Sequence, residues 1–542
     1  MGMVKTHEIV LKCSACKKSY VCEDLLTLVP HRSRFGYDII VYIGKSIFLK
    51  SRNEREVREE LEAKGVKISV SEIAYLARKF IVYLAIAHRE SSEKLRDYMN
   101  SSGGYILHLD ATCEGDSPHL MTGLDEISEF VLENIKIPSE KGDKIVPFLQ
   151  NIKQSYGIPR ALVHDMGKGI LFAVTQVFPD TPDFICHFHF LRDIGKDLYE
   201  KENDIIRNRL RKNAIQAVLR KRLTNFKKGI EKDPDSIIQL AHLLKEGEGD
   251  KNPVKPAPEV FLYILILWAL EGKKQGRGYG FPFDRPYLTF YRRLESIYSI
   301  IRQMRQSTDR RKADENKLYT QIFKNLSPVM HDSKLKEAAS LMQEKCRVFD
   351  KLRGSMRIAL PSGKLGLNDQ GTGESIKTIE SRVKIFYEWL CNYDKKSKED
   401  YRKMIQQIDK YWEKLFADPI KVKTLDGEIS ILPQRTNNIL EQFFRDLKRS
   451  HCKKTGFASI NKTLKAMLAD TPLVKNLDNQ NYMNILLKDK ANLEERFAEI
   501  DSTMVREELM KREQASQKIA PEIVKLIKEP QFPKAFAALF MV

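Results

Sequence analysis

Cysteine and long apolar runs are scarce in this 542-residue sequence. It has eight cysteines, mostly scattered, which argues against a disulfide framework and predicts a reducing, cytoplasmic location. The longest apolar run, Val260 to Leu270, has 11 residues. It is too short to cross a bilayer, so we expect a buried helix there. The polar N-terminal stretch also lacks the apolar segment of a signal peptide, and none is expected.

Positive charge, by contrast, is in excess. The chain has 92 Lys and Arg against 73 Asp and Glu, a net charge of +19. Such an excess of one sign indicates a polyanionic partner, most often nucleic acid. A basic protein without such a partner is the alternative. The length predicts roughly three or four domains.

Three carboxylates lie in three different local settings. Asp110 ends an apolar stretch that starts at Tyr105, and Asp165 ends another that starts at Ala161. Glu441 lies in a segment with helical spacing. Acids that two strands and a helix bring to one point can hold a pair of Mg²⁺ or Mn²⁺ ions, which many enzymes use to cut and join phosphodiesters. Taken singly, each aspartate is better explained as a turn residue or helix cap.

Strand-like and helix-like segments alternate between Gly103 and about residue 190. This pattern predicts a mixed α/β sheet with acids at strand ends, where such folds place their sites. The expected strands are 105–109, 120–124, 130–137, 161–164 and 184–187, and the expected helices are 144–156 and 170–178. Residues 190 to 430 are predicted to be helical and basic. The aromatic segment 277–283 resembles an RNA-recognition strand, but Pro282 favours a loop.

The first 50 residues contain a Cys-x-x-Cys pair, Cys13 and Cys16, followed by Cys22 and His31. Such a pair fits the tight turn that presents two thiolates to tetrahedral zinc, which predicts a zinc-ribbon-like module. The alternative is a pair of unbound thiols in a small basic module. The run 37–43 is expected to form a strand.

Residues 53–88 have the pattern of two helices joined by a glycine turn. Asn53 is expected to cap the first helix, Gly65 to end it, and Ser69 or Ser71 to cap the second. This is the plan of a helix-turn-helix unit, whose second helix enters the major groove of DNA. A purely structural helical hairpin is the alternative.

Basic and polar residues surround the third acid. Arg445, Lys448 and Arg449 follow Glu441 at spacings that suit phosphate contacts beside a metal site, and Thr436-Asn-Asn438 is expected to cap the helix. An amphipathic surface helix is the alternative. Upstream, Cys186 and His189 have ligand-like spacing but too few donors for zinc. We expect His189 to lie beside the acids, where it donates hydrogen bonds or positions a phosphate; a partly buried histidine is the alternative.

Taken together, these motifs resemble a prokaryotic insertion-sequence transposase of the DDE type, close to the Mutator-like group. In that group the first Asp ends the first strand of an RNase H-like core and the second ends the fourth. A Cys-x-x-His step follows, and the Glu comes after a long helical insertion. Here the Glu follows Asp165 by 276 residues. The alternatives for the third acid are Glu114, Asp116, Glu374 and Glu428.

The resemblance implies a DNA transposase that binds the ends of an insertion element and carries out Mg²⁺-dependent (or Mn²⁺-dependent) strand cleavage and transfer. It implies Asp110, Asp165 and Glu441 as metal ligands, with His189 assisting and Arg435, Arg445, Lys448 and Arg449 contacting DNA. Double-stranded DNA and a second copy of the chain, as a homodimer or larger assembly, are the expected partners.

The expected location of this enzyme is the cytoplasm, at the nucleoid. The alternative is a non-catalytic DNA-binding regulator derived from a transposase. The expected domains are a zinc-ribbon-like module (1–50), a helix-turn-helix domain (51–98), the first part of an RNase H-like core (99–195), an all-α insertion (196–430), the Glu helix of the core (431–465) and a helical C-terminal region (466–542).

Overall fold

The computed structural model of the chain is mixed α/β and divides into two compact units. The sheet unit comprises residues 1–186 and 417–542, and the helical unit comprises residues 187–416. The structure describes residues 10–20, 23–245, 257–274, 276, 278–307, 313–360, 376–397, 401–416, 418–424, 427–431, 433, 436–516, 523, 526–533 and 536–537.

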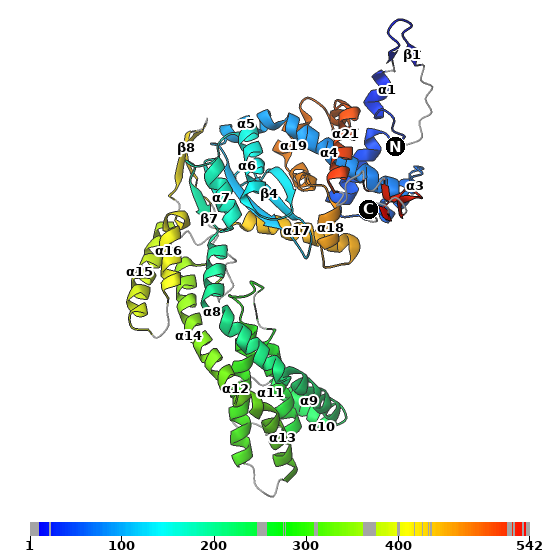
Figure 1. Cartoon of the computed structure of the whole chain (residues 1–542). Helices are drawn as coiled ribbons and strands as arrows, with labels where there is room; N and C mark the ends of the chain where they lie inside the picture. Colours follow the sequence, from blue (N-terminus) through cyan, green and yellow to red (C-terminus); the bar gives the residue numbers. More distant parts are fainter. Residues whose placement is uncertain are drawn as a thin grey trace. The chain divides into compact units, whose positions relative to one another are not determined.

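A five-stranded sheet forms the centre of the sheet unit (Figure 1). Its strands are β3 (Ile106–Thr112), β4 (His119–Asp125), β5 (Val131–Ile137), β6 (Ala161–His164) and β7 (Asp183–Ile185). The order across the sheet is β5-β4-β3-β6-β7. The β3–β4 and β4–β5 pairs are antiparallel, whereas β3–β6 and β6–β7 are parallel. The predicted mixed α/β sheet is therefore confirmed.

The two faces of this sheet are covered by different elements. Leu107 and Leu109 point into the main core, which also contains buried residues of α6 (Gly142–Tyr156) and α7 (Lys168–Val177). Ile106, which alternates with them, belongs to a smaller cluster on the opposite face. There it packs with residues of a two-stranded hairpin, β8 (Ile420–Thr424) and β9 (Gly427–Ile431).

That hairpin corrects the prediction that the helical insertion runs to residue 430. The helical unit ends at Phe416, and the strands β8 and β9 follow it. The chain then forms α17 (Asn438–Thr455) and α18 (Asn461–Ala466). Residues of both helices pack with Leu120 of β4.

The N-terminal helices lie in the sheet unit, and those after residue 36 share its main core with the sheet. Within the sheet unit these helices are α1 (Glu23–Leu28), α2 (Tyr37–Gly44), η1 (Lys45–Leu49), α3 (Glu54–Ala63), α4 (Val70–Glu90) and α5 (Ser92–Ser101). The C-terminal helices are η2 (Thr471–Asp478), α19 (Gln480–Leu487), α20 (Leu493–Ala498) and α21 (Ser502–Ser516). Buried residues from 37 to 178 and from 440 to 509 form one cluster. The domain boundary expected near residue 98 therefore does not separate two hydrophobic cores.

The helix pair α3–α4 is present with the predicted caps. Asn53 and Glu56 form a capping box, Gly65 has φ +78°, and the Ser69 side chain accepts a hydrogen bond from the backbone of Glu72. However, every residue of α4 from Phe80 to His88 is buried. This part of the helix is enclosed by protein and cannot lie in a DNA groove.

The strand predicted over 37–43 is wrong, because this run forms α2. Ile39, Ile40, Val41 and Ile43 are all buried. A short apolar run is typical of both a buried strand and a buried helix, so the sequence pattern alone does not distinguish them. Packing against α4 settles the conformation. A side chain at Gly44 would come within 2.2 Å of the Phe80 ring, so only glycine permits this close approach.

All the secondary-structure elements in the described part of the helical unit are α-helices (Figure 1). Its helices are α8 (His187–Lys212), α9 (Ile215–Ile230), α10 (Pro234–Lys245), α11 (Pro258–Gly272), α12 (Pro286–Ser307), α13 (Ala313–Met330), α14 (Ser333–Met356), α15 (Ile376–Asp394) and α16 (Arg402–Leu415). The apolar run Val260–Leu270 lies in α11, where Val260 and Ile266 are buried but Trp268 is 41% exposed. The described residues of the segment 277–283 contain no strand, as predicted.

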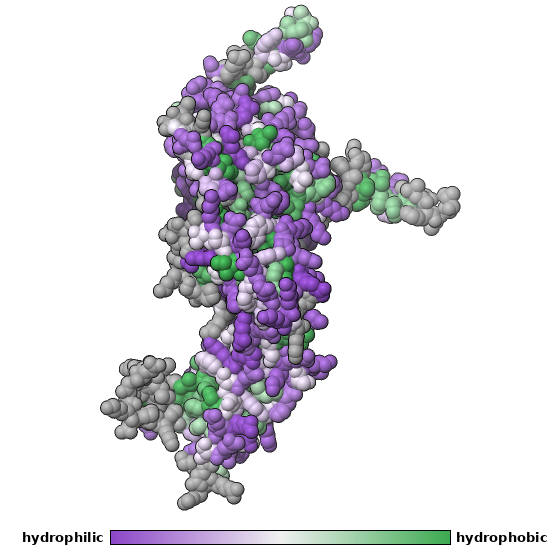
Figure 2. All heavy atoms as spheres, turned by 90° about the vertical axis from the view of Figure 1, so that its left-hand side faces the viewer, coloured by the Kyte–Doolittle hydropathy of each residue, from purple (hydrophilic) through white to green (hydrophobic). Residues whose placement is uncertain are grey.

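The surface is mostly hydrophilic on the face shown in Figure 2, and hydrophobic residues there form small, separate groups. Among the described residues, none of the helices is both long and apolar enough to cross a membrane.

Candidate functional site

Asp110 and Asp165 are brought together by two parallel strands. The last paired residues of β3 and β6 are Leu109 and His164. Asp110 comes directly after Leu109 in the sequence, and Asp165 comes directly after His164. Asp110 still lies within β3, which continues to Thr112 through its pairing with β4. Because parallel strands deliver their carboxyl ends to one edge of a sheet, the two carboxylates meet at that edge.

Two glycines shape the loop that follows Asp165. The backbone N–H of Gly167 donates a 2.9 Å hydrogen bond to Asp165 Oδ1. A Cβ at Gly167 would lie 2.9 Å from the same oxygen, and one at Gly169 would lie 1.9 Å from the carbonyl oxygen of Glu140. Larger residues at either position would displace the loop. The segment Gly167-Lys-Gly169 is therefore a sequence signal for a tightly folded loop beside this acid.

Several negative charges surround Asp110. Asp110 is only 9% exposed, and this burial, together with the charges of Asp165, Glu441 and Glu140, raises its pKa well above the usual value. A hydrogen bond from the backbone N–H of Ala111 acts in the opposite direction. The charges of three other carboxylates thus act on the buried Asp110 side chain, and this repulsion favours the protonated form of Asp110 or a nearby cation.

Glu441 lies in the first turn of α17. Leu440 and Phe443 on the same helix are buried in the main core, which anchors the helix, while Glu441 itself is partly buried. The Glu441 backbone N–H donates a 3.0 Å hydrogen bond to the carbonyl oxygen of Asn437. The acid therefore has a fixed place one turn from the helix start, and its charge acts on Asp110.

Asn437 does not cap α17 with its side chain, which corrects that part of the prediction for 436–438. No side-chain cap hydrogen bond forms at this helix start. Instead the Asn437 amide Nδ2 donates to the carbonyl oxygen of Leu109 at 2.8 Å, and its Oδ1 lies 2.8 Å from His108 Nδ1. The Asn437 backbone N–H donates to the sulfur of Cys186. Asn437 thereby joins the helix of Glu441 to the strand of Asp110.

His108 extends this connection. Its Nε2 lies 3.0 Å from Glu126 Oε2, and the histidine side chain is fully buried. Sequence reasoning missed His108, Glu126 and Glu140. A histidine inside an otherwise apolar strand is a usable signal, because a buried polar side chain requires partners.

Of the other candidates for the third acid, those that the structure describes are engaged elsewhere or exposed. Asp116 accepts hydrogen bonds from Asn461 and Lys465, which lower its pKa to about 2. Glu114 accepts from the backbone of Ile460. Glu428 lies on the β8–β9 hairpin and is exposed. Glu374 is outside the described residues.

The basic residues expected to contact DNA lie along α17. Arg445, Lys448 and Arg449 are all exposed. Lys448 is 3.6 Å from Glu114, and Arg449 is 3.3 Å from Asp446. Such exposed ion pairs are weak, so both side chains remain able to bind a phosphate. Arg435 lies outside the described residues.

The Cys-x-x-His step is divided between the two units. Cys186 is the last residue of the sheet unit, where it is buried and accepts the hydrogen bond from Asn437. His189 is a buried residue in the first turn of α8, in the helical unit. Its predicted place beside the acids stays a prediction.

The Cys13–Cys16 pair forms the predicted tight turn. It joins β1 (Leu11–Lys12) to β2 (Ser19–Tyr20), and the backbone N–H of Cys16 points to Cys13 Sγ at 3.5 Å. Hydrogen bonds from Cys16 and Ala15 lower the pKa of the Cys13 thiol. His31 is exposed, and Cys22 lies outside the described residues. The zinc site stays a prediction.

Across the part of the chain that the structure describes, no three or more His, Cys, Asp or Glu side chains are grouped closely enough to hold a metal ion. Comparison with known proteins assigns this chain to no family. No protein-family model matches this chain, and no curated protein is significantly similar to it.

Proposed function

We propose that this chain is a DNA transposase with an RNase H-like core, which cleaves the ends of an insertion element and joins them to target DNA. The observation that carries the proposal is the charge cluster around Asp110. Asp165 directly follows the neighbouring parallel strand, and the charge of Glu441, which lies on a helix 276 residues after Asp165, also acts on Asp110. The strand order is also consistent, since in chain order Asp110 lies in the first strand of the sheet and Asp165 directly follows the fourth.

The donors around Asp110 fit divalent cations in their chemistry. They are carboxylate oxygens, which Mg²⁺ and Mn²⁺ prefer, and a cation would offset the repulsion that raises the Asp110 pKa. Asp110, Asp165 and Glu441 would hold the ions. When bound, a pair of such ions lowers the pKa of an attacking water or DNA 3′-hydroxyl and stabilises the leaving oxygen.

The chain's own residues supply the remaining requirements. Arg445, Lys448 and Arg449 are exposed on the helix that carries Glu441, so a DNA backbone bound along α17 would meet positive charge next to the acids. The net charge of +19 favours the same partner. We further propose a homodimer or larger assembly acting on chromosomal DNA in the cytoplasm, because two element ends must be held together for joining.

The test uses the full chain with a supercoiled plasmid that carries the DNA flanking the gene as element ends. Nicked and joined products are measured on gels in the presence of Mg²⁺. Asp110→Asn, Asp165→Asn and Glu441→Gln should each lower product formation at least about 100-fold, since even outer-shell partners of metal ligands contribute about 10–100-fold. Asp116→Asn is the matched control, because Asp116 is exposed and bonded to Asn461 and Lys465. This control should retain near wild-type activity.

Two results would contradict the proposal. If the wild-type chain binds the ends but neither nicks nor joins them, it is a DNA-binding regulator. If Asp116→Asn is as inactive as Asp110→Asn, the acids assigned to the site are the wrong ones.

A further inference from the structure

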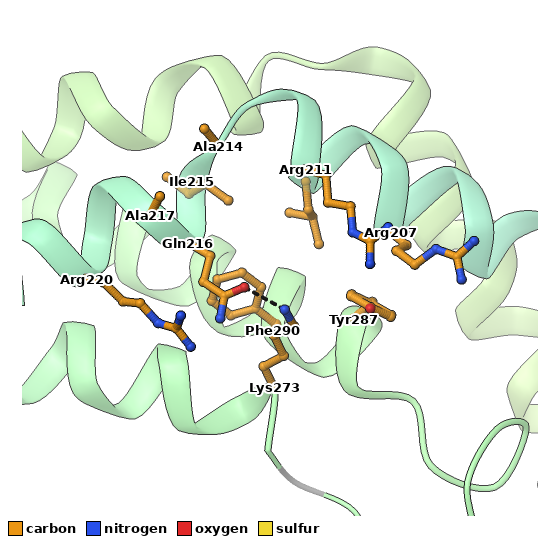
Figure 3. A pocket seen from close by; sticks show the side chains of 11 residues that line it. Arg207, Arg211, Ala214, Ile215, Gln216, Ala217, Arg220, Lys273, Tyr287 and Phe290 are labelled. Carbon is orange, nitrogen blue, oxygen red and sulfur yellow. Dashed lines mark hydrogen bonds between the residues drawn. The ribbon is translucent and has the colours of Figure 1, made fainter. Parts of the chain in front are cut away.

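A basic cavity lies within the helical unit, apart from the three acids. It has a volume of about 310 Å³ and is lined by residues of α8, α9 and α12 together with Lys273 at the end of α11. Figure 3 shows Arg211 and Arg220 on opposite sides of the hydrogen-bonded pair Gln216 and Lys273. This size is at the lower end of small-ligand pockets.

The lining of this cavity carries charge of one sign. Arg207, Arg211, Arg220 and Lys273 contribute four cationic side chains, and the remaining lining residues are neutral. Arg207 has an ion pair with Asp204 at 3.0 Å. Within the described residues, Arg211, Arg220 and Lys273 have no carboxylate at ion-pairing distance. Like charges gathered around a concave surface repel one another unless an anion neutralises them.

The backbone at the cavity also favours an anion. Ala214 adopts a left-handed conformation (φ +47°) at the junction of α8 and α9, which turns the chain so that residues of both helices line the cavity. The first turn of α9 has neither an acidic residue nor a side-chain cap. The partial positive charge of this helix start is therefore added to that of the side chains.

The floor of the cavity is apolar and leaves little space for a large ligand. Ile215 and Phe290 are buried there, while the Lys273 Nζ lies 5.4 Å from the centroid of the Tyr287 ring. Cations above an apolar floor, with guanidinium groups at either end, suit an oxyanion with several acceptor oxygens. Arginine recognises phosphate in this way through paired N–H donors.

We propose that this cavity is a phosphate-binding site in which Arg211, Arg220 and Lys273 hold one phosphate group of a ligand. The phosphate can belong to a DNA strand or to a free phosphorylated molecule. Binding of a DNA phosphate at this site rests on the proposed transposase function, whereas binding of a free phosphorylated molecule does not.

The test is isothermal titration calorimetry of the full chain with inorganic phosphate. The double variant Arg211→Gln/Arg220→Gln should bind phosphate at least about tenfold more weakly, because each lost charge-assisted hydrogen bond costs about that much. Lys212→Gln/Lys221→Gln is the matched control. It removes the same net charge from exposed neighbouring positions that do not line the cavity, and it should bind like the wild type. Circular dichroism checks that both variants are folded.

A second arm identifies the source of the phosphate. The titration is repeated with the chain saturated by a short DNA duplex. Loss of phosphate binding assigns the site to a DNA phosphate, and unchanged binding assigns it to a free phosphorylated molecule. The proposal is overturned if the wild type binds no phosphate at millimolar concentration, or if both double variants weaken binding equally. Failure of strand joining would leave these outcomes unchanged, so it bears on the transposase function alone.

Discussion

The Asn437 side chain is hydrogen-bonded to His108 across 329 residues of sequence, with 2.8 Å between Oδ1 and Nδ1. The amide orientation is fixed, because its Nδ2 donates to the carbonyl oxygen of Leu109, which can only accept. His108 Nδ1 is therefore the donor. Its Nε2 faces the Glu126 carboxylate, so both ring nitrogens face acceptors. The two residues fix the start of the Glu441 helix against the strand of Asp110.

Asn437→Ala should lower the free energy of unfolding by roughly 2–4 kcal/mol. It removes two buried hydrogen bonds and leaves His108 Nδ1 and the Leu109 carbonyl unpaired, each at a cost of about 1–3 kcal/mol. Urea denaturation of the full chain measures the change. Asn438→Ala is the matched control, since Asn438 is the next residue and is only partly buried; its effect should stay within about 0.5 kcal/mol. Equal effects of the two variants would contradict the tethering role.

Asp110 should make the metal-free protein less stable as the pH rises. Its pKa is raised in the folded state, above the ordinary value of 3.8, so the folded chain holds this proton more tightly than the unfolded chain does. The stabilisation is complete below pH 3.8 and is lost as the pH rises through the folded-state pKa. Asp110→Asn should remove this fall and stabilise the protein at neutral pH. Denaturation curves with EDTA at a series of pH values measure the difference.

Glu133, another buried acid of the sheet unit, should also make the protein less stable as the pH rises. Burial raises the pKa of Glu133 to about 7, so Glu133→Gln is the control that separates its contribution. If Asp110→Asn follows the wild-type curve at every pH, the electrostatic account of the site is wrong.

His88 should destabilise the protein in mild acid. Its ring is fully buried between the hydroxyls of Tyr482 and Tyr156 and the carbonyl oxygen of Leu132, and burial lowers its pKa to about 4. Stability is therefore complete above about pH 6.5 and is lost as the pH falls through 4, by up to roughly 3 kcal/mol. His88→Gln should flatten this part of the profile. Denaturation between pH 4 and pH 7 measures it, and an unchanged slope would contradict it.

The sheet could be predicted from the sequence because its signals are local. Apolar strands of the right length, such as Ala161–His164, alternate with amphipathic helices, and the helix boundaries carry caps such as Asn53 and Ser69. The β8–β9 hairpin also has a local sequence signal, because its residues alternate in polarity and an Asp-Gly pair at 426–427 is typical of a hairpin turn. The helical pattern of the surrounding sequence outweighs this short signal.

Other features depend on partners that are distant in sequence. Asn437 is indistinguishable from a helix cap until its hydrogen bond to Leu109, 328 residues away, is known. The α2 run forms a helix because α4 packs on it, and burial of α4 itself depends on C-terminal helices such as α21. Local propensity is a weak guide where such tertiary contacts decide.

Mg²⁺ should stabilise the wild-type chain and lose this effect when the acids are removed. A ligand that binds only the folded state adds about 2.7 kcal/mol at a concentration 100 times its dissociation constant, and here it would also relieve the repulsion around Asp110. Thermal unfolding with Mg²⁺ or EDTA measures the shift in Tm. Asp110→Asn and Asp165→Asn should show almost no shift, whereas Asp116→Asn should behave like the wild type because its carboxylate is bonded to Asn461 and Lys465. An equal Mg²⁺ shift in all four proteins would place the cation elsewhere on the chain.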